Sequence, residues 1–324
     1  MTGFKDRAIL LSDRLALPRL THGASDARLT TILFHRFLVQ GENWAKARDR
    51  IFRQCEFLAR HFNPVDIDTA TAMIGGAEQM RDHPLLVTID DAKLEVLEVA
   101  DIFVEFGLPV ALFVCNGWSG QSDEPEDVRH RLAMALRFHV GARRDVEVEG
   151  RRFTLDHVGN VDLLDALIET GFPETVVDQL RDLAVQRSAR PACDWSELRD
   201  LEGQGMTLGA HSVTHGKIAH YSATRQRFEI LASTETMRRH FGTCRTFAYP
   251  YGNPGTYDAD TRALLVEAGL ETGFITTPSF AAPGCDPLTL PRIVLPNAAM
   301  SDAVFAARVR GGGAPLTWLR ERFR

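Results

Sequence analysis

The sequence predicts one large α/β domain, built either as a barrel or as an open sheet. Short apolar runs alternate with segments of helical periodicity along most of the chain. The apolar runs are continuous rather than alternating, which is typical of parallel strands covered on both faces. Polar side chains follow several of these runs, at the strand ends where barrels and open sheets both bind ligands.

The first half of the chain reads as a β-α-β arrangement after an initial strand. Strands are expected at residues 29–34, 85–89 and 109–115, where Leu, Ile, Val and Phe dominate. Apolar residues recur at helical spacing over residues 92–106, and Gly107 supplies a C-terminal stop.

Residues 116–195 differ from this pattern and are interpreted as an insertion. They are mainly helical, with a short hairpin at residues 146–155. The insertion could cover a site as a lid, or it could be a structural helical layer.

The alternation then resumes up to residue 310, which we take as the end of a single domain, 1–310. Residues 311–324 follow as a flexible basic tail. The expected helices are 195–205, 221–242 and 258–268, and the expected strands are 206–211, 246–252, 270–277 and 288–296.

Composition narrows the functional classes. The net charge of −6 and pI of about 6.0 argue against general nucleic-acid binding. The chain has no apolar run long enough to span a membrane and no typical secretory signal. Its five cysteines contain no C-x-x-C pair, which argues against a disulfide framework or a zinc-thiolate site. A cytoplasmic location is expected.

Asp90 and Asp91 end the strand at 85–89 and raise the first chemical question. One of them could simply cap the next helix. Only one can do so, however, and the second carboxylate would still need a partner.

His211 and His215 follow another strand, four residues apart. A helical turn would put both imidazoles on one side. Neutral imidazole is a common ligand of divalent metals, and two histidines with a carboxylate form a frequent catalytic zinc set. Asp91 is the expected carboxylate ligand.

Residues 245–255 (RTFAYPYGNPG) form the third feature. The prolines and glycines predict a rigid turn after a strand. The turn could be purely structural, or it could form a pocket wall with a backbone N–H aimed at a developing oxyanion.

Together these motifs resemble the polysaccharide deacetylase family, also called NodB-homology or carbohydrate esterase 4. The order VTIDDA, VALFV, WSELRDLEGQGMTLGAHSVTH and FAYPYG carries the likeness across most of residues 29–296. The resemblance implies a distorted (β/α)7 TIM-like barrel and metal-dependent removal of N-acetyl groups from amino sugars. It also implies site roles: Asp90 as general base, Asp91, His211 and His215 as metal ligands, and the Tyr251 backbone N–H in the oxyanion hole.

Two departures place the chain outside the central branch of that family. Ala248 stands where an arginine is usual, and the late L-x-H motif that supplies the acid is absent. The chain looks more like branches with permuted motifs, such as the poly-N-acetylglucosamine deacetylases. His35 is then the candidate general acid, and Arg292 the candidate for orienting Asp90. Two alternatives are kept: a hydrogen-bonded rim histidine at position 35, and Arg36, a weaker candidate than Arg292, as the orienting residue.

The implied cofactor is a divalent metal, with Zn²⁺ favoured and Co²⁺, Ni²⁺ or Mn²⁺ also compatible with such ligands. The implied substrate is an N-acetylated sugar or glycan. Two other functions stay open. One is hydrolysis of another linear or cyclic amide, as in allantoinase-like members. The other is a degenerate carbohydrate-binding barrel without catalysis.

Overall fold

The computed structural model describes residues 4–15, 28–120, 124–137, 144–155, 160–185 and 191–312. The expected tail lies almost entirely beyond them, at residues 313–324. Among the described helices, none combines the length and the apolar character needed to cross a membrane.

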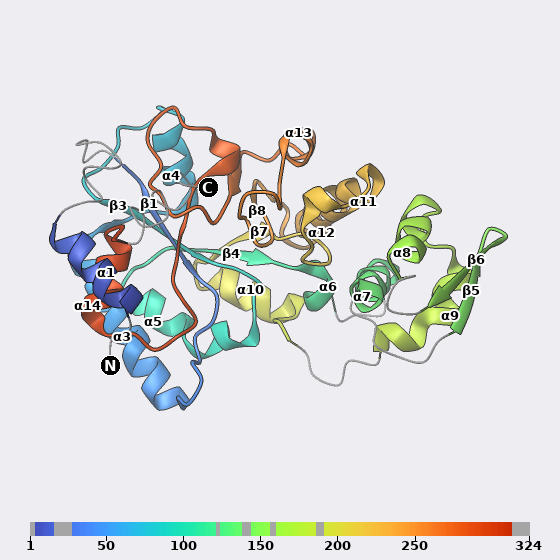
Figure 1. The fold of residues 1–324 in the computed structure, drawn as a ribbon, viewed down its shortest axis with the longest axis horizontal. Coiled ribbons are helices and arrows are strands. Elements are labelled where there is room, and N and C mark those ends of the chain that lie inside the picture. The colour runs from blue at the N-terminus through green and yellow to red at the C-terminus, as the bar shows by residue number, and fades with distance from the viewer. Residues whose placement is uncertain are drawn as a thin grey trace.

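A curled parallel sheet forms the centre of the molecule (Figure 1). Every strand pair within it is parallel, and β2 adds a short pairing to β3. This half-barrel with flanking helices confirms the prediction of a distorted (β/α)7 TIM-like barrel. In spatial order the strands are β10 (Ile293–Val294), β1 (Thr30–Phe34), β3 (Pro84–Ile89, beside β2, Asn63–Pro64), β4 (Val110–Val114), β7 (Thr207–Ala210), β8 (Thr246–Ala248) and β9 (Thr272–Phe274).

One late segment contacts both edges of this sheet. Leu290 forms a parallel bridge with Phe274 of β9, and the Ile275 N–H donates to the Leu290 carbonyl over 2.9 Å. Three residues later, Ile293 pairs with Ile32 of β1. Residues 290–294 therefore join the first strand of the barrel to the last.

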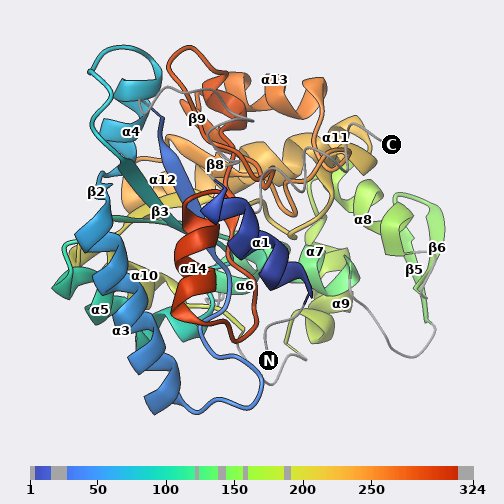
Figure 2. The same cartoon turned by 60° about the vertical axis from the view of Figure 1, so that its left-hand side comes forward.

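Helices flank the sheet on both faces and supply most of its cover. They are α1 (Phe4–Arg14), α3 (Trp44–His61), α4 (Ile67–Ile74), α5 (Ala100–Glu105), α10 (Trp195–Gly203), α11 (Ala223–Arg227), α12 (Ser233–Phe241), α13 (Ala259–Glu267) and α14 (Asp302–Val309). Helices α1 and α14 lie side by side in Figure 2 and are joined by the ion pairs Arg308–Asp6 and Arg310–Asp13. The two ends of the described chain thus pack together.

Two expected helices are interrupted. The region expected at 92–106 is a 3₁₀ turn, Leu94–Glu98, followed by α5, because Val99 leaves the helical region with φ −136°. The region expected at 221–242 contains a π-helical turn, Phe228–Ala232, between α11 and α12. Such turns often occur at functional sites.

The inserted residues form a lobe with its own apolar cluster. It consists of α7 (Pro125–Arg137), the antiparallel hairpin β5 (Arg144–Val148) and β6 (Arg151–Leu155), α8 (Asn160–Glu169) and α9 (Glu174–Val185). Figure 1 shows this lobe at one end of the molecule, beyond α6 (Asn116–Ser119) and α11. The expected hairpin is present, and the role of the lobe as a lid stays a prediction.

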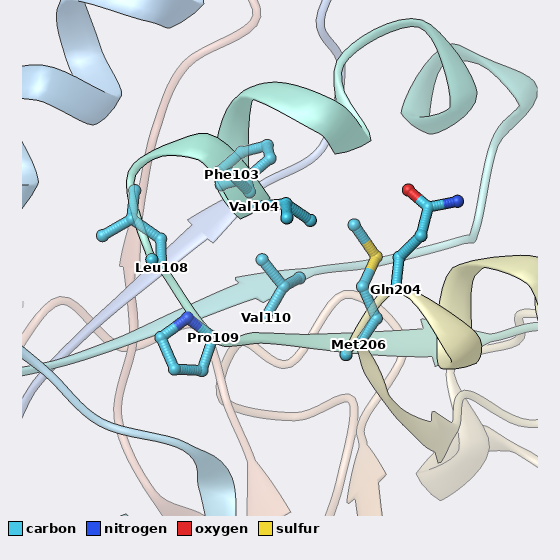
Figure 3. A pocket seen from close by; sticks show the side chains of 9 residues that line it. Phe103, Val104, Leu108, Pro109, Val110, Gln204 and Met206 are labelled. Atoms are coloured by element: carbon cyan, nitrogen blue, oxygen red, sulfur yellow. The ribbon is translucent and has the colours of Figure 1, made fainter.

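An apolar depression of about 250 Å³ lies at the opposite end of the strands from the predicted site (Figure 3). Its walls come from α5, from the start of β4 and from the approach to β7. Gln204 is the one polar side chain among its lining residues, so the depression offers no catalytic groups.

Candidate active site

The predicted site residues converge at the C-terminal ends of three strands. His35 directly follows β1, Asp90 and Asp91 follow β3, and His211 follows β7. Neighbouring parallel strands bring these ends to the same rim of the barrel, which explains how residues so distant in sequence meet.

The carboxylate of Asp91 is the centre of the cluster. Its Oδ1 lies 3.1 Å from Nε2 of His215 and 3.4 Å from Nε2 of His211. Its Oδ2 lies 3.3 Å from Nε2 of His35 and also contacts the ammonium group of Lys93. Three histidines and one lysine therefore surround a single carboxylate.

Three of these atoms fit a bound cation. Asp91 Oδ1, His211 Nε2 and His215 Nε2 are buried, and none has a hydrogen-bond partner among the described residues. Buried polar atoms without partners are costly and call for an explanation, such as an ion. One carboxylate oxygen and two imidazole nitrogens suit a divalent metal, zinc above all. The donor set therefore fits the metal that the sequence implied.

The ring of His211 is held in the form that a metal ligand needs. Its Nδ1–H donates to the Ala248 carbonyl over 2.7 Å, since a carbonyl oxygen can only accept. In the neutral ring Nε2 then carries the lone pair and faces Asp91. Ala248, which replaces the usual arginine, contributes through its backbone.

Burial and the neighbouring charges shift the pKa values of the residues in this cluster. Burial lowers the pKa of His211, but the Asp90 and Asp91 charges outweigh it and raise that pKa above its ordinary value. Burial lowers the pKa of His215, and the contact with Asp91 does not compensate. Burial alone would raise the pKa of Asp91, yet the surrounding histidines hold it well below its usual range.

Asp90 has a different partner. Arg292 donates from Nη1 and Nη2 to the two carboxylate oxygens over 2.7 and 2.8 Å. Arg292 is fully buried, and its Nε also donates to the Ile275 carbonyl over 3.2 Å. Burial raises the pKa of Asp90, but the Arg292 charge prevails and lowers it overall. Asp90 is thus an ionised carboxylate already oriented by a fork of two hydrogen bonds.

His211 and His215 are brought together by a loop, not by a helical turn. Ser212 and His215 have positive φ values of 65° and 55°, which an α-helix excludes. Glu229, in the π-helical turn, accepts hydrogen bonds from the N–H groups of Val213 and Thr214 over 3.1 and 2.8 Å. These contacts fold the loop so that the two rings lie 4.9 Å apart.

Backbone strain gathers at the same rim. Of the eight described non-glycine residues with positive φ, five belong to the site loops. Such conformations cost about 1–3 kcal/mol each and persist at functional sites where the surroundings enforce them. The five are Asp91, Ala92, Ser212, His215 and Tyr251.

Tyr251 stands at the mouth of the site with φ 63°. The residue is 44% exposed, and its ring lies 5.1 Å from the ring of His215. The Thr276 hydroxyl donates to the Tyr251 carbonyl over 2.7 Å, which holds the turn. The turn is therefore a wall of the site, and the oxyanion role of the Tyr251 N–H stays a prediction.

His35 lies at the cluster itself. Its side chain is 29% exposed, and its ligand atom groups with those of Asp91 and His215 within 4.8 Å. Position alone thus allows His35 either to transfer a proton or to join the ligands. Arg36, the alternative partner for Asp90, instead pairs with Glu95 over 2.7 Å, so that alternative is wrong.

Four further residues near the site were not found from the sequence. Glu229 holds the histidine loop, and Trp118 stacks on His215 with ring centres 5.3 Å apart. Lys93 contacts Asp91, and its position two residues after the pair was a usable signal. Arg137, from the inserted lobe, reaches the Thr214 carbonyl and gave no signal, because nothing in the sequence indicates where α7 ends in space.

Comparisons with known proteins agree with this geometry. A family model described as polysaccharide deacetylase matches residues 77–273, more than half of the 324-residue chain. No curated protein sequence matches the chain.

Several solved structures share the fold at low identity. The deacetylase PplD of Streptococcus pyogenes, solved with acetate, is 14% identical with a TM-score of 0.55, covering 84% of this chain and 93% of its own. IcaB from Ammonifex degensii is 16% identical with a TM-score of 0.56, covering 88% and 97%. The BpsB deacetylase domain from Bordetella bronchiseptica is 15% identical with a TM-score of 0.53, covering 84% and 97%.

Proposed function

Because this chain belongs to the polysaccharide deacetylase family, we propose that it hydrolyses the N-acetyl group of an amino sugar. The observation that carries the proposal is that Asp90 and Asp91 lie at the same rim of the barrel but have different partners. Three histidines lie around Asp91, and its Oδ1 and the Nε2 atoms of His211 and His215 have no hydrogen-bond partner among the described residues. Asp90 beside it is ionised and bound to Arg292. A metal-dependent amidase uses both kinds of group, a metal ligand and a general base.

Asp91, His211 and His215 would hold the divalent metal. When bound, such an ion polarises the acetyl carbonyl and lowers the pKa of water, toward about 7 in favourable zinc sites. The buried His211, with its tautomer set by Ala248, suits the ligand role better than the more exposed His35.

Asp90 would act as general base and take the proton of the attacking water. Its carboxylate stays ionised because the positive charge of Arg292, which donates to both oxygens, stabilises the negative form. The same fork fixes the direction of the carboxylate, which general-base catalysis requires.

His35 would act as general acid and pass a proton to the departing nitrogen. The Tyr251 N–H would donate to the oxyanion as it develops, and one such donor typically contributes about 3–4 kcal/mol. A degenerate binding barrel has no evident need for this spare carboxylate beside a ligand cluster.

The test combines metal content with acetate release. Purified protein should contain about one divalent ion per chain and release acetate from N-acetylated chito-oligomers, and chelation should abolish the release. Allantoin serves as the comparison substrate for the cyclic-amide alternative. Acetate release that survives complete metal removal, or ring opening of allantoin with inert oligomers, would overturn the proposal.

The role of His35 has its own test. His35→Ala should retain the metal and lose turnover, whereas His211→Ala should lose the metal. Loss of metal from His35→Ala would assign His35 to the ligands.

A further inference from the structure

Two cations from separate parts of the chain meet at the exposed ring of Tyr251. The Lys217 ammonium lies 5.6 Å from the ring centre, and Nη2 of Arg137 lies 3.5 Å from the Tyr251 hydroxyl. Lys217 comes two residues after His215, while Arg137 ends helix α7 of the inserted lobe. The lobe and the histidine loop thus both contribute positive charge to the mouth of the site.

The backbone around Lys217 is tightly held. A Cβ at Gly216 would lie 1.9 Å from the Tyr221 hydroxyl, so the loop passes directly against that side chain. Ile218 is fully buried, and the Ala219 N–H donates to the Thr256 carbonyl over 3.2 Å. Lys217 itself is exposed. A rigid loop therefore presents one flexible cation over Tyr251.

The two aspartates nearest the chemistry each contact a cationic side chain. Asp90 pairs with Arg292, and Asp91 contacts Lys93. Many surface arginines likewise pair with carboxylates, as Arg227 does with Glu267. Lys217 pairs with no carboxylate within the described parts of the chain. Lys217 therefore brings to the mouth a positive charge that no carboxylate of the described residues matches, on a chain whose net charge is −6.

The chain has four lysines, Lys5, Lys46, Lys93 and Lys217, and two of them stand at this site. Each follows a predicted metal ligand by two residues: Lys93 follows Asp91 and Lys217 follows His215. Lysine ammonium groups serve as point charges for phosphate and carboxylate groups.

We propose that Lys217, Arg137 and Tyr251 form a subsite for an anionic group carried by the N-acetylated sugar. The subsite rests on the proposed deacetylase function and narrows its substrate class to charged sugars. A phosphate or a uronic carboxylate one group away from the acetamide supplies the same chemistry. The Tyr251 ring would pack against the sugar while the two cations bind the charge.

Matched substrates provide the test. Acetate release is compared for N-acetylglucosamine, its 1-phosphate, its 6-phosphate and a disaccharide that joins it to a uronic acid. At least one charged substrate should exceed the neutral sugar in kcat/KM by about tenfold, mainly through KM, and added salt should reduce the advantage. The charged substrate with the highest kcat/KM shows whether the subsite prefers a phosphate or a carboxylate.

Lys217→Met should lower that charged-to-neutral ratio by about tenfold, and Lys217→Arg should restore most of it. Lys46→Met, which removes an exposed lysine of α3, is the matched control and should leave the ratio unchanged. Equal kcat/KM for charged and neutral sugars in the wild type would overturn the subsite, as would a Lys217→Met variant with an unchanged ratio.

Failure of the subsite is distinguishable from failure of deacetylation. If no substrate releases acetate, the deacetylase proposal fails, and calorimetry with the same four sugars still tests the subsite. Tighter binding of a charged sugar to the wild type than to Lys217→Met would support it. Equal binding to both proteins would reject it.

Discussion

Asp90 and Asp91 are adjacent in sequence and both buried, yet they sit in different surroundings. Both oxygens of Asp90 accept hydrogen bonds from one guanidinium. Around Asp91 stand three imidazoles and an ammonium group, and its Oδ1 has no hydrogen-bond partner among the described residues. The hydrogen bonds of Asp90 are thus provided by the protein, whereas Oδ1 of Asp91 is left with room for a further partner such as a metal ion.

The difference separates two roles that a carboxylate cannot perform at once. A ligand must share its electrons with the metal, while a base must keep them available for a proton. Asp90 binds Arg292 and Asp91 contacts the histidines, so we propose that these two roles are divided between the neighbours. Single substitutions should therefore separate metal binding from turnover.

The largest effect is expected for Asp91→Asn. The amide is neutral, so one metal ligand and its charge are lost together. Metal content should fall toward zero, and acetate release should fall by about 10⁴-fold. Elemental analysis beside the kinetic assay checks both. A variant with a full complement of metal would show that Asp91 is not a ligand.

Asp90→Asn should separate metal binding from turnover most clearly. Metal content should stay at the wild-type level while kcat falls by about 10³-fold. Arg292 would lose its buried counter-charge, so unfolding in urea should show a loss of about 3–5 kcal/mol. Wild-type turnover in this variant would remove Asp90 from the mechanism.

Glu229→Gln tests the loop that carries His211 and His215. Gln replaces one acceptor oxygen with a donor and cannot keep every bond to the loop backbone. Metal affinity should weaken by about 10–100-fold, measured by competition with a chelator. Glu235→Gln on the exposed face of α12 is the control. Equal affinities in the two variants would show that Glu229 does not position the loop.

The pH dependence of metal binding gives the smallest effect. The pKa of His211 is raised in the metal-free protein, so a proton competes for Nε2 at pH values already above about 6.5. Affinity should therefore decline as the pH falls through this range, by up to about tenfold per pH unit. Chelator competition at pH 8 and pH 6 measures it. A constant affinity would contradict the competition.

The sequence predicted those parts of the site that directly follow recognisable strands. Continuous apolar runs predicted the strands, and the polar residues after them predicted one shared rim, as His35, Asp90 and His211 show. The conformation of the histidine loop was missed because its geometry depends on Glu229, which lies on a later element. The spacing of the two histidines does not encode these hydrogen bonds, which come from a distant element.

The contacts of Lys93 and Arg137 were not predicted from the sequence, for a different reason. A sequence gives the order of charges but not the reach of a side chain across a fold. Arg137 approaches Tyr251 only because the inserted lobe packs beside the barrel. Whether the insertion covers the site as a lid or is a structural layer stays a prediction, and the contact of Arg137 with Tyr251 is a place to test it.

The segment that joins the two sheet edges also carries Arg292, 202 positions after the aspartate it binds. During synthesis, Asp90 leaves the ribosome long before its counter-charge exists. A chain that stops short of residue 292 lacks both the segment that joins the sheet edges and the guanidinium that binds Asp90. The same late segment thus completes the barrel and pairs Asp90, the proposed base, with its counter-charge.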